Sequence, residues 1–139
     1  MTPSLFYRIA AVLLVLFAAG HTLGFARTDP TWGVDALVGS MRSSRFAVQG
    51  VQRSYWDFYV GFGLFVTLFL LFSALLAWAL GSLPAGTLAL MPLVRWGLAG
   101  CFVGVTVLSF RYFFVIPATI SGLTTVCLLI AAWQAGKPA

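Results

Sequence analysis

The stretch FYVGFGLFVTLFLLFSALLAWAL (Phe58–Leu80) decides the class of fold, because it holds no charged residue over its whole length. A helix needs about 20 mainly apolar residues to cross the hydrocarbon core of a membrane. The core offers no water to the backbone, so N–H and C=O groups there must be satisfied internally, as they are in an α-helix. The stretch therefore predicts a membrane-spanning helix.

Three more windows have the same length and character as this stretch. The four predicted spans are residues 5–25, 58–80, 88–110 and 112–133. The whole chain is 61% hydrophobic and only 8% charged, whereas soluble domains carry roughly a quarter charged residues. We expect an all-α protein, a four-transmembrane-helix bundle that forms a single integral membrane domain over residues 1–139.

The connections between the spans differ in length. GSLPAG (81–86) predicts a tight turn by its Gly and Pro content. Almost nothing separates the last two spans except Arg111 and its neighbours, and Pro117 is expected to kink or restart the final helix. The one long connection runs from Ala26 to Asp57.

Two features of the long connection predict helix. Asp29-Pro30 reads as an N-cap followed by proline at the first helical position. From Ser44 onward, Val48, Val51 and Tyr55 share one helical face. We therefore expect an interfacial helical loop between the first and second spans.

The net charge of +5 comes from eight basic and three acidic residues, which lie mostly between the apolar runs. That position favours attraction to anionic lipid headgroups and argues against nucleic-acid binding. The basic residues on the long-loop side of the predicted spans are Arg27, Arg42, Arg45, Arg53 and Arg111, and those on the other side are Arg8, Arg95 and Lys137. The positive-inside rule then places the long loop in the cytoplasm and both termini outside.

Several polar residues are expected at the same depth in the membrane, at the long-loop end of the spans. His21 lies about 24 Å into the first span at 1.5 Å per residue, which is near the far side of a core about 30 Å thick. Asp57 opens the second span on that side, and Arg111 lies at a turn on the same side. The candidate ligand-binding residues are His21, Arg53, Tyr55, Asp57, Tyr59 and Arg111.

Each candidate also has a structural interpretation. Ser54-x-x-Asp57 fits a helix-capping box, and Tyr and Trp are typical of the membrane interface. Arg111 and Arg95 could extend their guanidinium groups toward lipid phosphate. His21 could hydrogen-bond between helices instead of handling protons or a headgroup.

Catalytic and metal-binding motifs are absent from the sequence. There is no nucleophile elbow, P-loop, dinucleotide fingerprint, CxxC or paired-carboxylate motif. One histidine cannot supply bis-histidine haem ligation, and with scattered cysteines it does not make a zinc site. Cys101 and Cys127 fall at different depths, so we expect no disulfide. We expect no metal and no cofactor.

Two G-x-x-x-G patterns, Gly20–Gly24 and Gly100–Gly104, permit close helix approach, and we expect them to pack inside the bundle.

GHTLGF (20–25) together with RSYWDFYVGFG (53–63) resembles a group of small, uncharacterised bacterial four-helix membrane proteins. The resemblance implies the fold and a multi-pass location in the bacterial inner (cytoplasmic) membrane, and it implies no functional residues. The four-helix sterol-isomerase and sigma-2-receptor superfamily is a poorer match, because it places acids inside its bundle and this sequence has no Glu and no mid-membrane Asp.

Two function classes follow from these residues. The first is a membrane protein that binds a lipid-like or amphipathic small molecule at the long-loop end. The second is a structural or accessory subunit that acts through helix contacts, as a homo- or hetero-oligomer. A small membrane enzyme is the least supported class.

Overall fold

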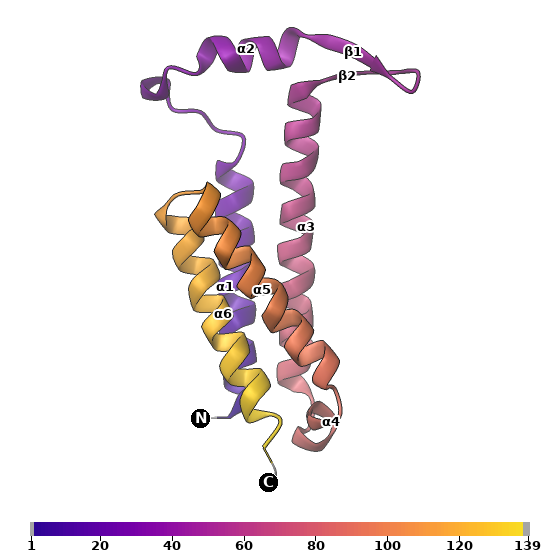
Figure 1. The fold of residues 1–139 in the computed structure, drawn as a ribbon, viewed down its shortest axis with the longest axis vertical. Coiled ribbons are helices and arrows are strands. Elements are labelled where there is room, and N and C mark those ends of the chain that lie inside the picture. The colour runs from indigo at the N-terminus through magenta and orange to yellow at the C-terminus, as the bar shows by residue number, and fades with distance from the viewer. Residues whose placement is uncertain (1, 138–139) are drawn as a thin grey trace. The chain divides into compact units, whose positions relative to one another are not determined.

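The computed structural model describes residues 2–137 and is all-α apart from one small hairpin (Figure 1). The elements in chain order are α1 (Pro3–Gly24), η1 (Pro30–Trp32), α2 (Asp35–Ser43), β1 (Arg45–Val48), β2 (Val51–Ser54), α3 (Tyr55–Ser82), α4 (Ala85–Ala89), α5 (Pro92–Tyr112) and α6 (Val115–Gln134). The predicted all-α class is confirmed.

Four of these helices, α1, α3, α5 and α6, are long and apolar enough to cross a membrane. They overlap the four predicted spans, but residues 88–91 of the third predicted span lie before α5, at the end of α4 and in the break that follows it. Helix α3 has 28 residues, so it is about 42 Å long and exceeds a hydrocarbon core of about 30 Å. Helix α3 therefore begins before the apolar run from which the span was predicted, and its first turn carries Asp57.

The chain divides into two compact units. We call Met1–Phe17 with Leu70–Ala139 the terminal unit, and Ala18–Phe69 the loop unit.

In the loop unit, the helix expected from Ser44 onward is wrong. Residues 45–54 form an antiparallel hairpin, in which Phe46 pairs with Arg53 and Val48 with Val51. Gln49 and Gly50 make its two-residue turn, with φ of 48° and 81°. Two consecutive residues with positive φ suit the right-handed twist of a hairpin, and glycine adopts that conformation without strain.

The short helix expected at Pro30 is confirmed as η1. The Asp29 side chain caps it by accepting hydrogen bonds from Thr31 N at 2.8 Å and Thr31 Oγ1 at 2.7 Å. These bonds stabilise the carboxylate and hold the pKa of Asp29 below its usual value.

In the terminal unit, α5 and α6 pack along one another through small and polar side chains. Thr125 Oγ1 donates to the Phe102 carbonyl at 2.8 Å and lies 2.8 Å from Thr106 Oγ1. Pro117 lies in the first turn of α6, where a missing N–H breaks no helical hydrogen bond. The sequence left open whether Pro117 kinks or restarts the final helix, and the structure shows the restart.

Helices α1 and α3 approach closely at Gly81. A Cβ on Gly81 would lie 3.1 Å from the Ser4 carbonyl and 3.1 Å from Tyr7 Cβ. Tyr7 is fully buried at this crossing. The expected close approach at the G-x-x-x-G patterns is not what the structure shows, because a Cβ on Gly20, Gly24, Gly100 or Gly104 meets no atom of the same unit within 4 Å.

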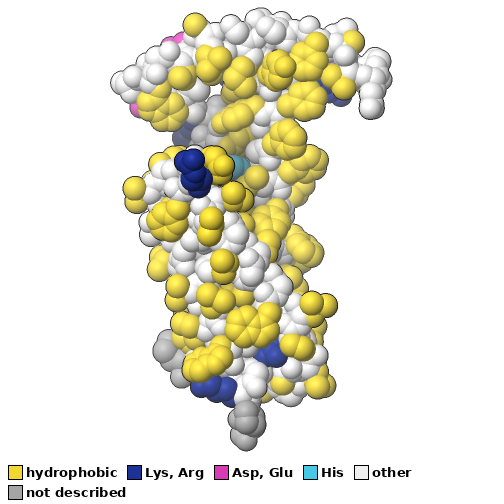
Figure 2. Space-filling model, viewed as in Figure 1, with side chains coloured by type: hydrophobic (Ala, Val, Ile, Leu, Met, Phe, Trp, Pro, Cys, Tyr) yellow, Lys and Arg dark blue, Asp and Glu magenta, His cyan; other side chains and the backbone are white. Residues whose placement is uncertain are grey.

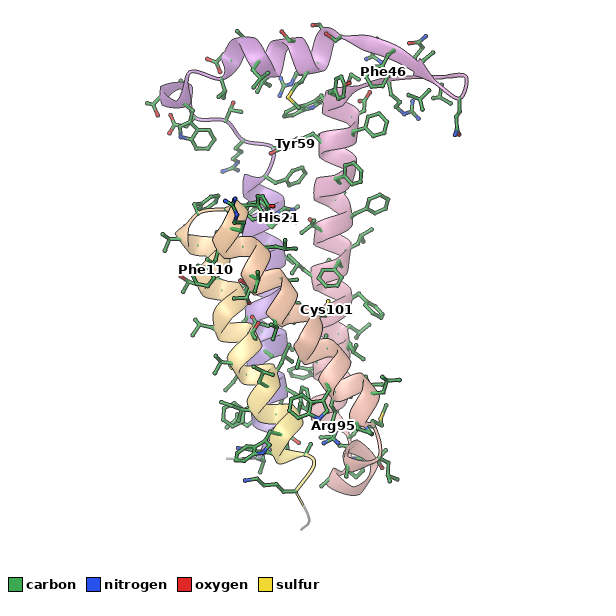
Figure 3. All side chains as sticks on the ribbon, viewed as in Figure 1. His21, Phe46, Tyr59, Arg95, Cys101 and Phe110 are labelled. Carbon is green, nitrogen blue, oxygen red and sulfur yellow. The ribbon has the colours of Figure 1, made fainter. Side chains whose placement is uncertain are left out.

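Arg95 is buried, with only 3% of its surface exposed, and does not extend toward the membrane surface as one interpretation expected. Its Nη1 donates to the Ala132 carbonyl and its Nη2 to the Ala89 carbonyl, both at 3.1 Å. These carbonyls belong to the last turns of α6 and α4, where helices lack internal donors and carry partial negative charge. Arg95 therefore caps two helix ends (Figure 3).

Candidate functional site

His21 joins the end of α1 to α3 inside the loop unit. Its Nε2 lies 3.0 Å from the Gly63 carbonyl oxygen. A carbonyl only accepts, so Nε2 carries the hydrogen in this contact. This contact is the interhelical hydrogen bond that was one of the two sequence interpretations of His21.

A pair of threonines lies beside this contact. Thr22 Oγ1 donates to the Ala18 carbonyl at 2.7 Å and lies 2.9 Å from Thr67 Oγ1. Because the single Thr22 hydroxyl hydrogen serves Ala18, Thr67 is the donor between the two hydroxyls. The Gly63 carbonyl has two lone pairs, and it lies 3.3 Å from Thr67 Oγ1 as well as 3.0 Å from His21 Nε2.

Phe25 and Tyr59 complete the same junction. The Phe25 ring stacks on His21 with centroids 5.1 Å apart, and Tyr59 OH donates to the Phe25 carbonyl. A Cβ on Gly63 would overlap the Phe25 ring. We call His21, Thr22, Phe25, Tyr59, Gly63 and Thr67 the clamp. His21 and Tyr59 are labelled in Figure 3.

Asp57 caps its own helix. Ser54 N donates to Asp57 Oδ2 at 2.8 Å, and Asp57 N donates to Ser54 Oγ at 3.2 Å. This reciprocal pair is the predicted capping box. Ser54 is 2% exposed, so the box is shielded from competing water on that side.

Aromatic contacts fasten the hairpin to the first turns of α3. The Phe46 ring lies 4.9 Å from Tyr55 and 6.0 Å from Phe58, measured between centroids. Arg42 stacks over Trp56 at 4.3 Å. Tyr55, one of the predicted site residues, is 63% exposed. Its ring contributes to the contact between the hairpin and α3.

A groove of about 220 Å³ lies along another face of α3. We call it the loop groove, and it is lined by Arg53, Asp57, Phe58, Gly61, Phe62 and Phe65. From Asp57 to Phe65 it runs about 12 Å along the helix axis. One end is therefore charged and the rest is aromatic, with Gly61 as the low point between the rings.

The structure divides the predicted site residues by face. Arg53 and Asp57 line the loop groove, while His21 and Tyr59 belong to the clamp, roughly 150° around α3 at 3.6 residues per turn. Arg111 belongs to the terminal unit, where it is exposed and lies 5.5 Å from the Tyr112 ring centroid. Its predicted approach to His21 and Asp57 stays a prediction.

Sequence reasoning missed Phe58, Gly61, Phe62 and Phe65 as groove residues. A signal for them exists, because they follow one another at the i, i+3, i+4, i+7 spacing that places residues on one helical face. Phe62 and Phe65 are 65% and 68% exposed, so their rings stand outward and form walls beside the glycine.

Within residues 2–137, no group of three or more His, Cys, Asp or Glu side chains could hold a metal ion. Cys101 and Cys127 are both free thiols, in agreement with the predicted absence of a disulfide between them.

Comparison of the chain with known protein families, with curated proteins and with solved structures yields no match. The fold and composition themselves support a small multi-pass membrane protein, with four apolar helices of spanning length. Figure 2 agrees with that class, because hydrophobic side chains cover much of the outward surface of the helices.

Proposed function

We propose that this protein binds an amphipathic, lipid-like molecule in the loop groove, within a bacterial cytoplasmic membrane. The observation that carries the proposal is the groove's polarity, with Arg53 and Asp57 at one end and Phe58, Phe62 and Phe65 along the rest. A lipid has the same order of parts, a polar head followed by an apolar chain. The bacterial location is supported by the sequence resemblance alone.

The charge at the head of the groove favours an anionic group. Arg45 and Arg53 both interact electrostatically with Asp57, which leaves one positive charge in excess among the three. One oxygen of Asp57 is engaged by Ser54 N. Arg53 Nη1 donates to the Gln52 carbonyl at 2.9 Å, and a guanidinium has five N–H groups, so further donors remain for a phosphate or carboxylate.

Gly61 permits a direct test, because a Cβ there meets nothing within 4 Å. Gly61→Leu places a side chain in the groove, and Arg53→Gln removes its cation. We expect native mass spectrometry of the purified protein to show a retained lipid in the wild type and less of it in both variants. Gly97→Leu, at an equally open glycine of α5, and Arg42→Gln, at an arginine outside the groove, serve as controls. Equal lipid retention in all five proteins would contradict the proposal.

An accessory subunit is the second candidate, and one observation favours it. A Cβ on Gly100 or Gly104 of α5 would meet nothing of its own unit within 4 Å, and Cys101 beside them is exposed. Small residues let helix backbones approach closely in a membrane. In native membranes, a bifunctional thiol reagent should then join Cys101 to a partner in a Cys127→Ser background. A chain that remains monomeric under these conditions would count against this function.

A further inference from the structure

The terminal unit carries basic residues and no acid at all. The three acidic residues of the chain are Asp29, Asp35 and Asp57, and all belong to the loop unit. The basic residues of the terminal unit are Arg8, Arg95, Arg111 and Lys137. No acidic side chain of this unit can therefore pair with these cations.

One of these cations is already accounted for, and two others, Arg8 and Lys137, are exposed. Arg95 is buried against two helix-end carbonyls. Arg8 lies over the Trp78 ring at 5.6 Å, and Lys137 lies over the Trp133 ring at 3.6 Å. Tryptophan is enriched at the level of lipid headgroups, so both stacks place a cation where phosphates lie.

An apolar groove of about 420 Å³ lies between α1 and α3, and its lining includes Trp78, the ring over which Arg8 lies. We call it the terminal groove. Its lining on α1 runs from Ala11 to Leu16, and its lining on α3 runs from Leu71 to Trp78. Ala11 and Ala74 are each 4% exposed and form the floor, whereas Leu16 and Leu75 are 59% and 66% exposed and form walls.

Arg8 stands at the head of this groove. It precedes Ala11 and Val12 by three and four residues, so it continues the same face of α1. The methylene stem of Arg8 packs near Gly81, whose Cβ position is 3.4 Å from Arg8 Cγ. The groove then extends about 4–12 Å deeper along α1 than Arg8. A phosphate bound by Arg8 would therefore have its acyl chain directly in line with the groove.

We propose that the terminal groove is a second lipid site, which binds an anionic phospholipid with its phosphate on Arg8 and one acyl chain between α1 and α3. The site is separate from the loop groove and shares no residue with it. Charge complementarity selects the occupant, because an all-cationic unit with no acid favours a lipid of net negative charge over a zwitterionic one.

The test is a lipid titration of the full-length chain in detergent, followed by native mass spectrometry. The probes are phosphatidylglycerol and phosphatidylcholine with identical acyl chains. We expect the wild type to bind phosphatidylglycerol more tightly. Arg8→Gln should raise the dissociation constant for phosphatidylglycerol by about fivefold, as expected for one basic residue at a membrane surface, and leave phosphatidylcholine binding unchanged.

Arg42→Gln is the matched control for charge, because Arg42 also stacks on a tryptophan and lies outside the terminal groove. Val15→Phe fills the groove from its half-exposed wall and should weaken the binding of both lipids. Val107→Phe, at an exposed position of α5 outside the groove, should weaken neither.

Three outcomes would overturn the proposal. Equal affinities for the two lipids in the wild type would remove its electrostatic basis. An effect of Arg8→Gln no larger than that of Arg42→Gln would show that only net charge matters. A second copy of the chain, bound in place of lipid and lost in Val15→Phe, would assign the groove to an oligomer interface. Arg8 is exposed, so Arg8→Gln should fold like the wild type. It therefore tests the phosphate site even if Val15→Phe does not fold.

Discussion

At the scale of single residues, Arg95 shows how a buried cation is held without an acid. The carbonyls of Ala132 and Ala89 each take one of its N–H groups, and among the described residues its Nε is buried with no hydrogen-bond partner. Two helix C-termini therefore supply the negative partial charge that a carboxylate would otherwise provide.

We expect Arg95→Leu to lower the free energy of unfolding by about 1–3 kcal/mol, because the buried Ala132 carbonyl would lose its donor. The bond to Ala89 is only partly buried, so water can replace that donor. Arg95→Lys should recover only part of this loss, since one ammonium group cannot reproduce the two-pronged guanidinium. Reversible denaturation in detergent measures both values. Arg111→Leu, at an exposed arginine, should change stability by less than about 0.5 kcal/mol. An Arg95→Leu protein as stable as the wild type would contradict the capping role.

Gly63 carries the second residue-scale prediction. A Cβ at this position would overlap the Phe25 ring, which itself stacks on His21. Gly63→Ala should therefore destabilise the wild type but cost less in a Phe25→Ala background, where the ring is gone. The measurement is a double-mutant cycle, and contact between the two residues predicts a coupling energy of about 0.5–3 kcal/mol. Additive effects would show that the ring moves aside freely.

At the scale of elements, the hairpin depends on the conformation of two residues. Gly50 has φ of 81°, and an L-residue in the left-handed region costs roughly 1–2 kcal/mol. Gly50→Ala should therefore reduce the hydrogen-exchange protection of β1 and β2. The same substitution at Gly39, inside α2, should raise helix stability by about 0.5–1 kcal/mol. Two changes of the same sign would contradict the hairpin turn.

The spans and the caps could be predicted from sequence, and the hairpin could not. Spanning length and apolar composition are imposed by the membrane, so four windows sufficed. The Ser54–Asp57 box depends only on residues three apart. Val48 and Val51, by contrast, fit a helical face and also face one another as a strand pair. Short apolar runs of this kind do not separate the two periods, and the Gln49-Gly50 turn decided the outcome.

The candidate site was predicted only in part, for a geometric reason. Depth along a helix follows from residue number, but the face on which a side chain lies depends on how helices are rotated against one another. Phe58 and Tyr59 are neighbours at one depth, yet Phe58 lines the loop groove and Tyr59 bonds to Phe25 across the clamp. Reasoning by depth therefore placed Tyr59 with Asp57 and left Phe58 and Phe62 out.

At the scale of the whole molecule, the burial of Arg95 strengthens the expected insertion. The positive-inside rule counts basic residues that flank the spans, and Arg95 is buried against two helix-end carbonyls and not in a flanking loop. By the topology predicted from sequence, the long-loop side keeps Arg27, Arg42, Arg45, Arg53 and Arg111, and the opposite side keeps only Arg8 and Lys137. The long loop should therefore lie in the cytoplasm.

Single cysteines test this orientation in intact cells that express the protein. In a Cys101→Ser, Cys127→Ser background, Ala47→Cys places an exposed thiol on the hairpin, and Thr2→Cys places one before α1. A membrane-impermeant maleimide should label Thr2→Cys at once and Ala47→Cys only after the membrane is permeabilised.

Arg42→Gln with Arg45→Gln should then increase labelling of Ala47→Cys in intact cells, because the difference in flanking charge narrows and some chains insert the other way. Immediate labelling of Ala47→Cys with a protected Thr2→Cys would mean that the arginines of the loop do not determine insertion and are available to bind anionic lipid on the outer surface.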